Sequence, residues 1–288
     1  NAAFCSTTGV VSSDRSVIGN ACNVKTADEI NDFIQEKIDE HLNPTGIGQR
    51  SGLRDLMIDI GQFSRKVEPW TVIQICASRN SYIKLCNPMG KICSVVDVTE
   101  DIDFTSERGY KLVLDTIQQS PRCVLFVSLP CTSGCRFNVD INCKRAGSEE
   151  KIRFHQKLFN ALWAQFDRVC QAVNYNIPIV FEWPRHNILW KSPKVKRLLE
   201  RPGCMMTDFD GCTFGLQSIR KGYEYRFLKK PWAFATNIPD ICYAFRSCCT
   251  GVCKYHQHDE TRGKNALHSQ KYTPLMAHTI HIAFYYYF

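Results

Sequence analysis

The sequence predicts an α/β fold in which helices cover both faces of a largely parallel sheet. From Pro69 onwards, short apolar runs alternate with stretches of helical periodicity. The runs are continuously apolar, which is typical of strands that are buried on both faces. Ligands of such sheets bind beyond the carboxyl ends of the strands, so we expect the functional residues there. The expected strands are 72–76, 92–96, 123–127 and 178–181.

Helical signals define the remaining elements. The T-x-x-E spacing that starts at Thr26 is that of a capping box and opens an amphipathic helix. An apolar stripe over 152–173 predicts a long helix between the third and fourth strands, and a last helix is expected over 272–284. We therefore expect an N-terminal arm and helical extension (1–66), a main α/β domain (67–200), a small basic Cys/His-rich module (201–262) and a C-terminal helix that returns to the main domain (263–288).

The composition excludes several classes of protein. With 44% hydrophobic and 22% charged residues among 288, the chain resembles a folded globular protein rather than a disordered or fibrous one. No apolar run reaches the roughly 18 residues of a membrane span, and the N-terminus lacks the layout of a signal peptide. We expect an intracellular location, nuclear or cytoplasmic, and no membrane partner. The first residue, Asn1, suggests a piece of a longer polyprotein.

Charge and cysteine content point to a nucleic-acid partner and to reduced thiols. The net charge is +8, and basic residues gather in 191–201 and 220–230, which suits an anionic partner such as nucleic acid. The alternative is that these cations only solvate the surface. Sixteen cysteines in a chain of this length, without a secretory signal, are expected to be reduced and mostly packed as small apolar residues.

Two reactive side chains follow neighbouring strands of the predicted sheet. Cys131 comes after the third strand in a loop restricted by Pro130, and Glu182 ends the fourth. A carboxylate that follows an apolar strand is partly desolvated, which raises its pKa and suits a proton donor. A thiol beside it is a candidate nucleophile. Each residue alone could equally be structural, as a packed cysteine or a carboxylate held by a cation.

A Cys/His-rich segment near the C-terminus is a candidate zinc site. Several soft ligands fall within 248–258, compatible with a tetrahedral zinc ion that holds a small module together. Cys212 and Cys242 are possible substitutes among the ligands. The expected set is Cys249, Cys253, His256 and His258.

The order of short motifs resembles that of the DNA cytosine 5-methyltransferases. A Pro-Cys pair after one strand, a Glu after the next, a basic segment and a terminal helix follow one another. More narrowly, the chain is similar over about 70–285 to a divergent group of such proteins from mobile-element and virus-like polyproteins. The matching pieces are 128–132, 140–142, 181–184, 190–195, 208–215, 230–232, 256–258 and 272–274.

This resemblance implies a fold, a reaction and a cofactor. The fold would be a Rossmann-like class I S-adenosylmethionine-dependent methyltransferase sheet. The Cys131 thiolate would add to carbon 6 of a flipped-out cytosine while Glu182 donates at ring nitrogen 3, and carbon 5 would then take the methyl group of S-adenosylmethionine. The partner would be nucleic acid, with DNA favoured over RNA.

The resemblance also implies where the cofactor and the nucleic acid bind. The Gly-rich turn of the family is replaced here by Cys76, Ala77 and Ser78, which makes close approach of the ligand harder. The expected cofactor residues are Ile75, Cys76, Ala77, Ser78, Asn80, Asp97, Asp103, Ser128 and Pro130. The expected nucleic-acid contacts are Arg136, Asn142, Lys144, Arg145, Arg226, Lys229 and Lys230.

Two other functions remain open at this level. The missing Gly-rich turn is compatible with a nucleic-acid-binding module that kept the fold and lost catalysis. Cys131 could also serve acyl transfer or redox chemistry, but no histidine base is evidently placed for it and Cys135 makes a C-x3-C pair rather than C-x-x-C.

Overall fold

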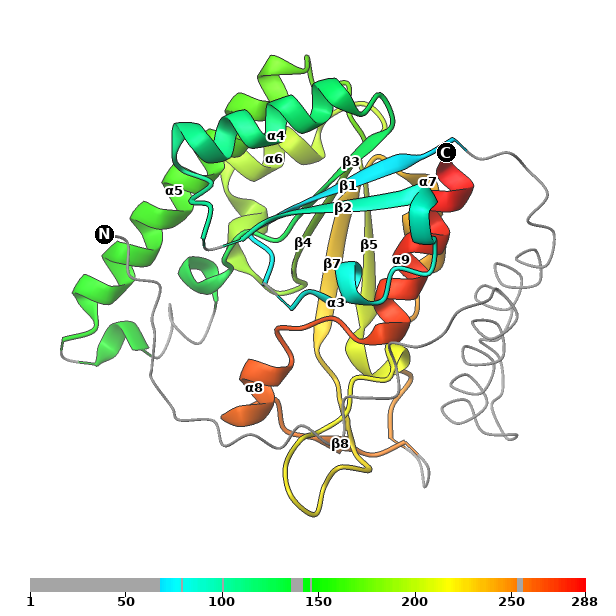
Figure 1. The fold of residues 1–288 in the computed structure, drawn as a ribbon. Coiled ribbons are helices and arrows are strands. Elements are labelled where there is room, and N and C mark those ends of the chain that lie inside the picture. The colour runs from blue at the N-terminus through cyan, green and yellow to red at the C-terminus, as the bar shows by residue number, and fades with distance from the viewer. Residues whose placement is uncertain (1–67, 79, 100, 136–141, 146, 253–255) are drawn as a thin grey trace.

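A six-stranded sheet forms the centre of the molecule. A computed structural model describes residues 68–78, 80–99, 101–135, 142–145, 147–252 and 256–288. The strand order is β2-β1-β3-β4-β7-β5 (Figure 1). The strands are β1 (Trp70–Ile75), β2 (Cys93–Val98), β3 (Cys123–Val127), β4 (Ile179–Pro184), β5 (Met205–Asp210) and β7 (Pro231–Thr236). The predicted α/β class and largely parallel sheet are therefore confirmed.

The strand directions divide the sheet into two parts. β1 to β4 pair in parallel, in a register that places Val127 of β3 beside Phe181 of β4. β7 runs antiparallel to both of its neighbours, β4 and β5. The four strands expected from the sequence are β1 to β4, each within a few residues of its predicted bounds. The other two strands were not predicted.

Helices cover both faces of the sheet and enclose two apolar cores (Figure 1). α4 (Glu107–Gln119), α5 (Glu149–Ala172) and α6 (Pro193–Leu199) pack on one face, where Phe166 contacts Phe181. α3 (Tyr82–Leu85), α7 (Pro239–Ala244) and α9 (Pro274–Tyr287) pack on the other, where Ile280 and Phe126 belong to the same core. Strand residues alternate between the cores, as the pleat of a strand requires.

Polar side chains fix where several helices begin. Ser106 accepts from the backbone N–H of Gly109 at the start of α4, and Thr273 accepts from Met276 N at the start of α9. α5 begins after Ser148, as expected, but the Ser148 side chain makes no capping hydrogen bond. Glu149 and Glu150 in its first turn complement the helix dipole instead.

Residues 201–262 are divided between the central sheet and a smaller unit. This range was expected to be a module, yet it supplies β5 and β7 to the main sheet. Beside the sheet lies a two-stranded unit of β6 (Phe227–Leu228) and β8 (His258–Asp259). The remaining helices are η2 (Gly90–Ile92), η3 (Thr132–Gly134), η5 (Asn142–Lys144), η6 (Ile188–Lys191), η7 (Gly211–Phe214) and α8 (Lys264–His268).

The C-terminal segment returns to the main domain, because α9 packs against α3 and α7. The expected N-terminal arm and helix, 1–66, lie outside the described residues. Within the part of the chain that is described, no helix has the length and apolarity needed to span a membrane.

Candidate active site

Cys131 and Glu182 meet at the carboxyl ends of adjacent parallel strands. Cys131 follows β3 and immediately precedes η3, and Glu182 lies near the end of β4. Both side chains are half-buried, and they are close enough for the Glu182 charge to act on the Cys131 thiol. The two residues singled out from the sequence therefore share one site.

A tyrosine hydroxyl holds the Glu182 carboxylate. Tyr272 Oη donates to Glu182 Oε2 at 3.0 Å and lies 2.8 Å from Ser128 Oγ. The Tyr272 ring is buried and packs edge-on against Phe126, with 5.6 Å between the ring centroids. Burial raises the pKa of Glu182, while the Lys230 charge and the Tyr272 hydrogen bond oppose that rise. The site thus contains a carboxyl group suited to binding a proton.

Lys230 supplies the positive charge of the site. It lies between β6 and β7, and its Nζ donates to the backbone oxygen of Ser269 and sits 4.8 Å from the ring centroid of Trp232. Burial lowers the pKa of Lys230, and the charges of Glu182 and Cys131 oppose that change. The sequence suggested a nucleic-acid contact for Lys230, but the structure places it inside the Cys131 site.

The electrostatic surroundings keep the Cys131 thiol protonated in the free protein. The pKa of Cys131 is raised from 9.0 to about 11, because burial and the Glu182 carboxylate raise it more than Lys230 lowers it. A thiolate is the reactive form of cysteine. The resting site therefore holds a thiol that must lose its proton before it can act as a nucleophile.

The loop that carries Cys131 is fixed by the segment after β4. Asn187 Nδ2 donates to the backbone oxygen of Cys131 at 3.0 Å, and Trp183 Nε1 donates to Leu129 O at 2.7 Å. Gly134 allows this approach, because a Cβ atom there would overlap Asn187 Oδ1 and the side chain of Leu189. These contacts set the position of the thiol relative to β4.

The turn after β1 has the backbone that a glycine would favour. Cys76 has a φ of 61°, in the left-handed region, although it is not glycine. Ala77 is half-buried, and Ser78 and Asn80 are exposed in the same turn. A left-handed non-glycine residue costs about 1–2 kcal/mol. Cys76 therefore adopts, at this cost, a backbone conformation that a glycine would adopt freely.

The other expected cofactor residues surround this turn. Ile75 O accepts from Ser128 N at 3.1 Å, which joins the ends of β1 and β3, and Pro130 lies half-buried before the thiol. The charge of Asp103 raises the pKa of the Cys76 thiol, so these two residues are near each other. Asp103 Oδ1 also accepts from the backbone and hydroxyl of Thr105.

Asp97 is a buried carboxylate at the end of β2. Its side chain is only 5% exposed, and Lys84 Nζ lies 3.3 Å from Oδ2. Oδ1 is buried without a hydrogen-bond partner among the described residues. Burial raises the pKa of Asp97, and Lys84 partly offsets this. Asp97 is therefore an acceptor that lacks a full set of donors.

The expected nucleic-acid residues do not form one group. Arg136 lies outside the described residues, and Asn142 begins η5. Lys144 and Arg145 are exposed in the segment that follows the Cys131 loop. They remain candidates for contacts to a phosphate backbone.

Arg226 and Lys229 belong to the region around β6. The Arg226 guanidinium lies 4.7 Å from the ring centroid of Tyr223, and the Tyr225 ring beside it is 62% exposed. Lys229 is exposed, with Nζ 3.9 Å from Asp210 Oδ2. Arginine and exposed aromatic rings together are typical of surfaces on which bases stack.

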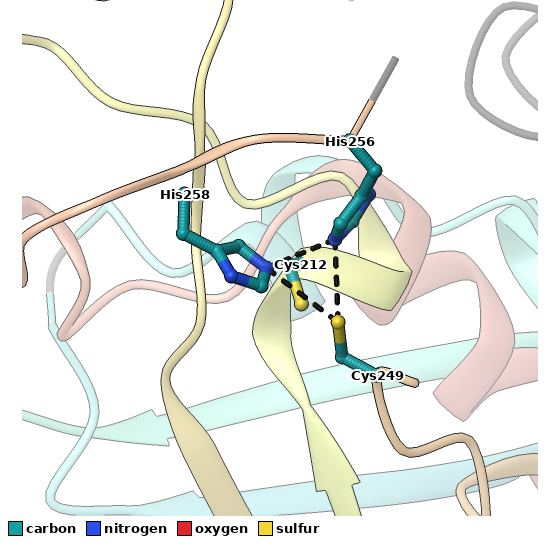
Figure 2. A group of neighbouring side chains, drawn as sticks. All are labelled: Cys212, Cys249, His256 and His258. Atoms are coloured by element: carbon teal, nitrogen blue, oxygen red, sulfur yellow. Dashed lines mark hydrogen bonds between the residues drawn. The ribbon is translucent and has the colours of Figure 1, made fainter. Parts of the chain in front are cut away.

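A separate cluster of cysteine and histidine lies beside β6 and β8 (Figure 2). Ligand atoms of Cys212, Cys249, His256 and His258 all lie within 4.8 Å of one another. Of the expected ligands, Cys253 lies outside the described residues. Cys212, which the sequence suggested only as a substitute, occupies the fourth position.

Sequence reasoning did not place two residues, Tyr272 and Lys230, in the Cys131 site. In the sequence analysis, Tyr272 had no function beyond its place in a matching motif. Its hydroxyl nevertheless donates a hydrogen bond to Glu182, which lies 90 positions earlier in the sequence. Lys230 was assigned to nucleic acid. A Lys followed by Pro231 at the start of a buried strand is the signal that could have placed Lys230 near the sheet.

Comparisons with known protein families, with curated proteins and with solved structures found no match to this chain.

Proposed function

We propose that this protein is an S-adenosylmethionine-dependent methyltransferase that acts on carbon 5 of cytosine in nucleic acid, with DNA favoured. The observation that carries this proposal is the pairing of a Cys131 thiol with a Glu182 carboxyl at the carboxyl ends of adjacent parallel strands, with Lys230 and Tyr272 around them. The sheet order and its antiparallel β7 are compatible with the class I methyltransferase fold.

The residues of the site can carry the proton transfers that addition to cytosine requires. Because the pKa values of Cys131 and Glu182 are both raised, one proton shared between thiol and carboxylate is compatible with this pair. The proton passes from Cys131 Sγ to Glu182, and the thiolate then forms a bond to carbon 6 of the ring. Glu182 gives the same proton to ring nitrogen 3, so that negative charge does not build up on the base.

Release of the product reverses these transfers. The proton on carbon 5 leaves to solvent after methylation, the bond between Cys131 Sγ and carbon 6 breaks, and the proton on nitrogen 3 returns to Glu182. Cys131 then recovers a proton from Glu182. Lys230 stabilises whichever of the two groups is charged, and Tyr272 and Ser128 keep the carboxyl group oriented.

The residues at the ends of β1 and β2 fit an adenosyl cofactor. Cys76 in the turn after β1 has a left-handed backbone. Asp97 Oδ1 is a buried acceptor without a partner among the described residues, to which a ribose hydroxyl could donate if the side chains around it moved. When bound, S-adenosylmethionine supplies an electrophilic methyl group. The exposed cations Lys144 and Arg145 support binding of a polyanion.

The test is transfer of labelled methyl from S-adenosylmethionine to duplex DNA, single-stranded DNA and RNA. We expect wild-type protein to label one of them and Cys131→Ala to label none. Cys135→Ala is the matched control, because Cys135 lies in the same loop and has no role in the proposed chemistry; it should retain activity. Equal labelling by Cys131→Ala would refute the covalent step.

A negative result would favour a different function. Correctly folded wild-type protein that transfers no methyl group and shows no thermal shift with S-adenosylmethionine would indicate a nucleic-acid-binding module with a degenerate site. The Lys84 contact over Asp97 and the cysteine in the turn are the observations that favour this second candidate.

A further inference from the structure

Three segments, one of them well separated in the sequence from the other two, converge on the Cys/His cluster (Figure 2). Cys212 lies in η7, directly after β5. Cys249 belongs to the loop after α7, and His256 and His258 belong to the segment that forms β8. Each side chain directs its ligand atom toward the same point, so the cluster would join these three segments if an ion occupied it.

The distances from Cys249 Sγ to the two histidines agree with those around a tetrahedral zinc ion. Zn–S and Zn–N bonds of about 2.3 and 2.0 Å give S···N separations of about 3.5 Å. Cys249 Sγ lies 3.4 Å from His256 Nε2 and 3.5 Å from His258 Nε2. The two Nε2 atoms are 2.9 Å apart, so the rings must separate by a few tenths of an ångström, to about 3.3 Å, around zinc.

The surroundings orient the ligands of the cluster. Gly251 N donates to Cys249 Sγ at 3.4 Å, and Lys229 lies near the cluster with Nζ 3.9 Å from Asp210 Oδ2. Asp210 Oδ2 accepts from Cys249 N at 2.8 Å, which fixes the backbone of that ligand. The His256 ring stacks on Phe227 with 4.7 Å between centroids, which fixes the ring plane.

We propose that Cys212, Cys249, His256 and His258 bind a structural zinc ion. Two thiolates and two neutral imidazoles balance the charge of Zn²⁺, and two sulfur with two nitrogen donors select zinc among the common divalent ions. All four positions are taken by protein, so the ion has no open site for catalysis. Binding releases the two thiol protons to solvent.

The ion would also stabilise the backbone beside the candidate active site. Gly211, the neighbour of ligand Cys212, donates its N–H to Lys230 O at 2.8 Å. His258 pairs with Phe227, which lies just before the segment that leads to Lys230. Zinc would therefore hold the backbone on both sides of the cation that faces Cys131 and Glu182.

The test is the metal content of the full chain, purified without added metal and measured by elemental mass spectrometry. We expect about one zinc ion per chain in the wild type and strong loss of zinc in Cys249→Ser, His258→Gln and Cys212→Ser. Cys248→Ser is the matched control, since Cys248 adjoins a ligand but its sulfur contacts Arg185 and Asp208 instead. It should retain zinc, as should Cys253→Ser.

A second measurement does not depend on the folding of any variant. Cobalt added to metal-free wild-type protein should give the absorption of a tetrahedral Co²⁺ centre with thiolate charge transfer, and zinc should displace it. Chelation should lower the melting temperature of the wild type. Folded wild-type protein that binds neither metal would overturn the proposal, as would loss of zinc in Cys253→Ser with retention in Cys212→Ser. None of these results depends on methyl transfer.

Discussion

The raised pKa of Cys131 predicts slow reaction with thiol reagents and an unusual pH profile. At pH 8 a thiol with a pKa of 9.0 is about 10% thiolate, whereas one with a pKa of about 11 is about 0.1% thiolate. This 100-fold difference in thiolate fraction corresponds to about 2.7 kcal/mol. Because the more basic thiolate is also the better nucleophile, alkylation of Cys131 by iodoacetamide at pH 8 should be about 10- to 100-fold slower than that of an ordinary cysteine.

The pH profile separates the effect of the pKa from that of restricted access. Burial slows the reagent at every pH, but only the pKa decides where the rate stops rising. The logarithm of the Cys131 rate should rise with unit slope up to about pH 10 without levelling off. Modification at each cysteine can be followed by peptide mass spectrometry, with the exposed Cys143 as an internal control for reagent and temperature.

Two variants test the cause of the raised pKa. Glu182→Gln removes a negative charge that raises it, so alkylation of Cys131 should become faster and its profile should shift to lower pH. Lys230→Met removes a positive charge that lowers the pKa, so alkylation should become slower. A wild-type rate that levels off near pH 9 would refute the reasoning. A shift of the profile in the same direction in both variants would also refute it.

Three further predictions concern stability. Burial lowers the pKa of His281 from 6.5 to about 4, so on acidification the unfolded state binds the proton first, and the free energy of unfolding should fall by about 3 kcal/mol between pH 6.5 and pH 4. Urea unfolding of His281→Gln should show a smaller fall than the wild type. An equal fall in the two proteins would contradict this. Gly134→Ala should lose about 1–3 kcal/mol of unfolding free energy, because its Cβ would overlap the Asn187 side chain; an unchanged melting temperature would show that the loop can move. Lys84→Ala should lose about 1–2 kcal/mol, since it leaves the Asp97 carboxylate without its cation; the loss should disappear in the Lys84→Ala, Asp97→Asn double variant.

Local sequence patterns predicted the first four strands, the long helix α5 and the last helix α9. Continuous apolar runs identify strands buried on both faces, and the stripe before Val173 has helical spacing. β5 escaped prediction because polar residues interrupt its apolar pattern, whereas β7 is as long as β1 and was overlooked. Nothing in their own sequence shows that β7 lies between β4 and β5, since that arrangement depends on pairing over long distances.

The candidate sites were predictable only as far as strand ends and ligand spacing allowed. Cys131 and Glu182 could be placed together because parallel strands bring their carboxyl ends to one edge. Tyr272 and Cys212 could not, because each reaches its partners from a distant part of the chain. Lys230 looked like a surface cation, and only the path of the chain into β7 puts it beside Glu182.

The position of β7 has a consequence for how the protein assembles. β5 precedes β7 in the chain, but β7 is its one partner in the central sheet. One side of β4 likewise has no partner until β7 has been synthesised and has paired with it. A nascent chain that has been synthesised only as far as β5 therefore exposes the edge of β4 and a solitary strand, both open to pairing with other chains. Folding of this half of the sheet must wait for β7, and Tyr272, which positions the Glu182 carboxylate, is synthesised later still.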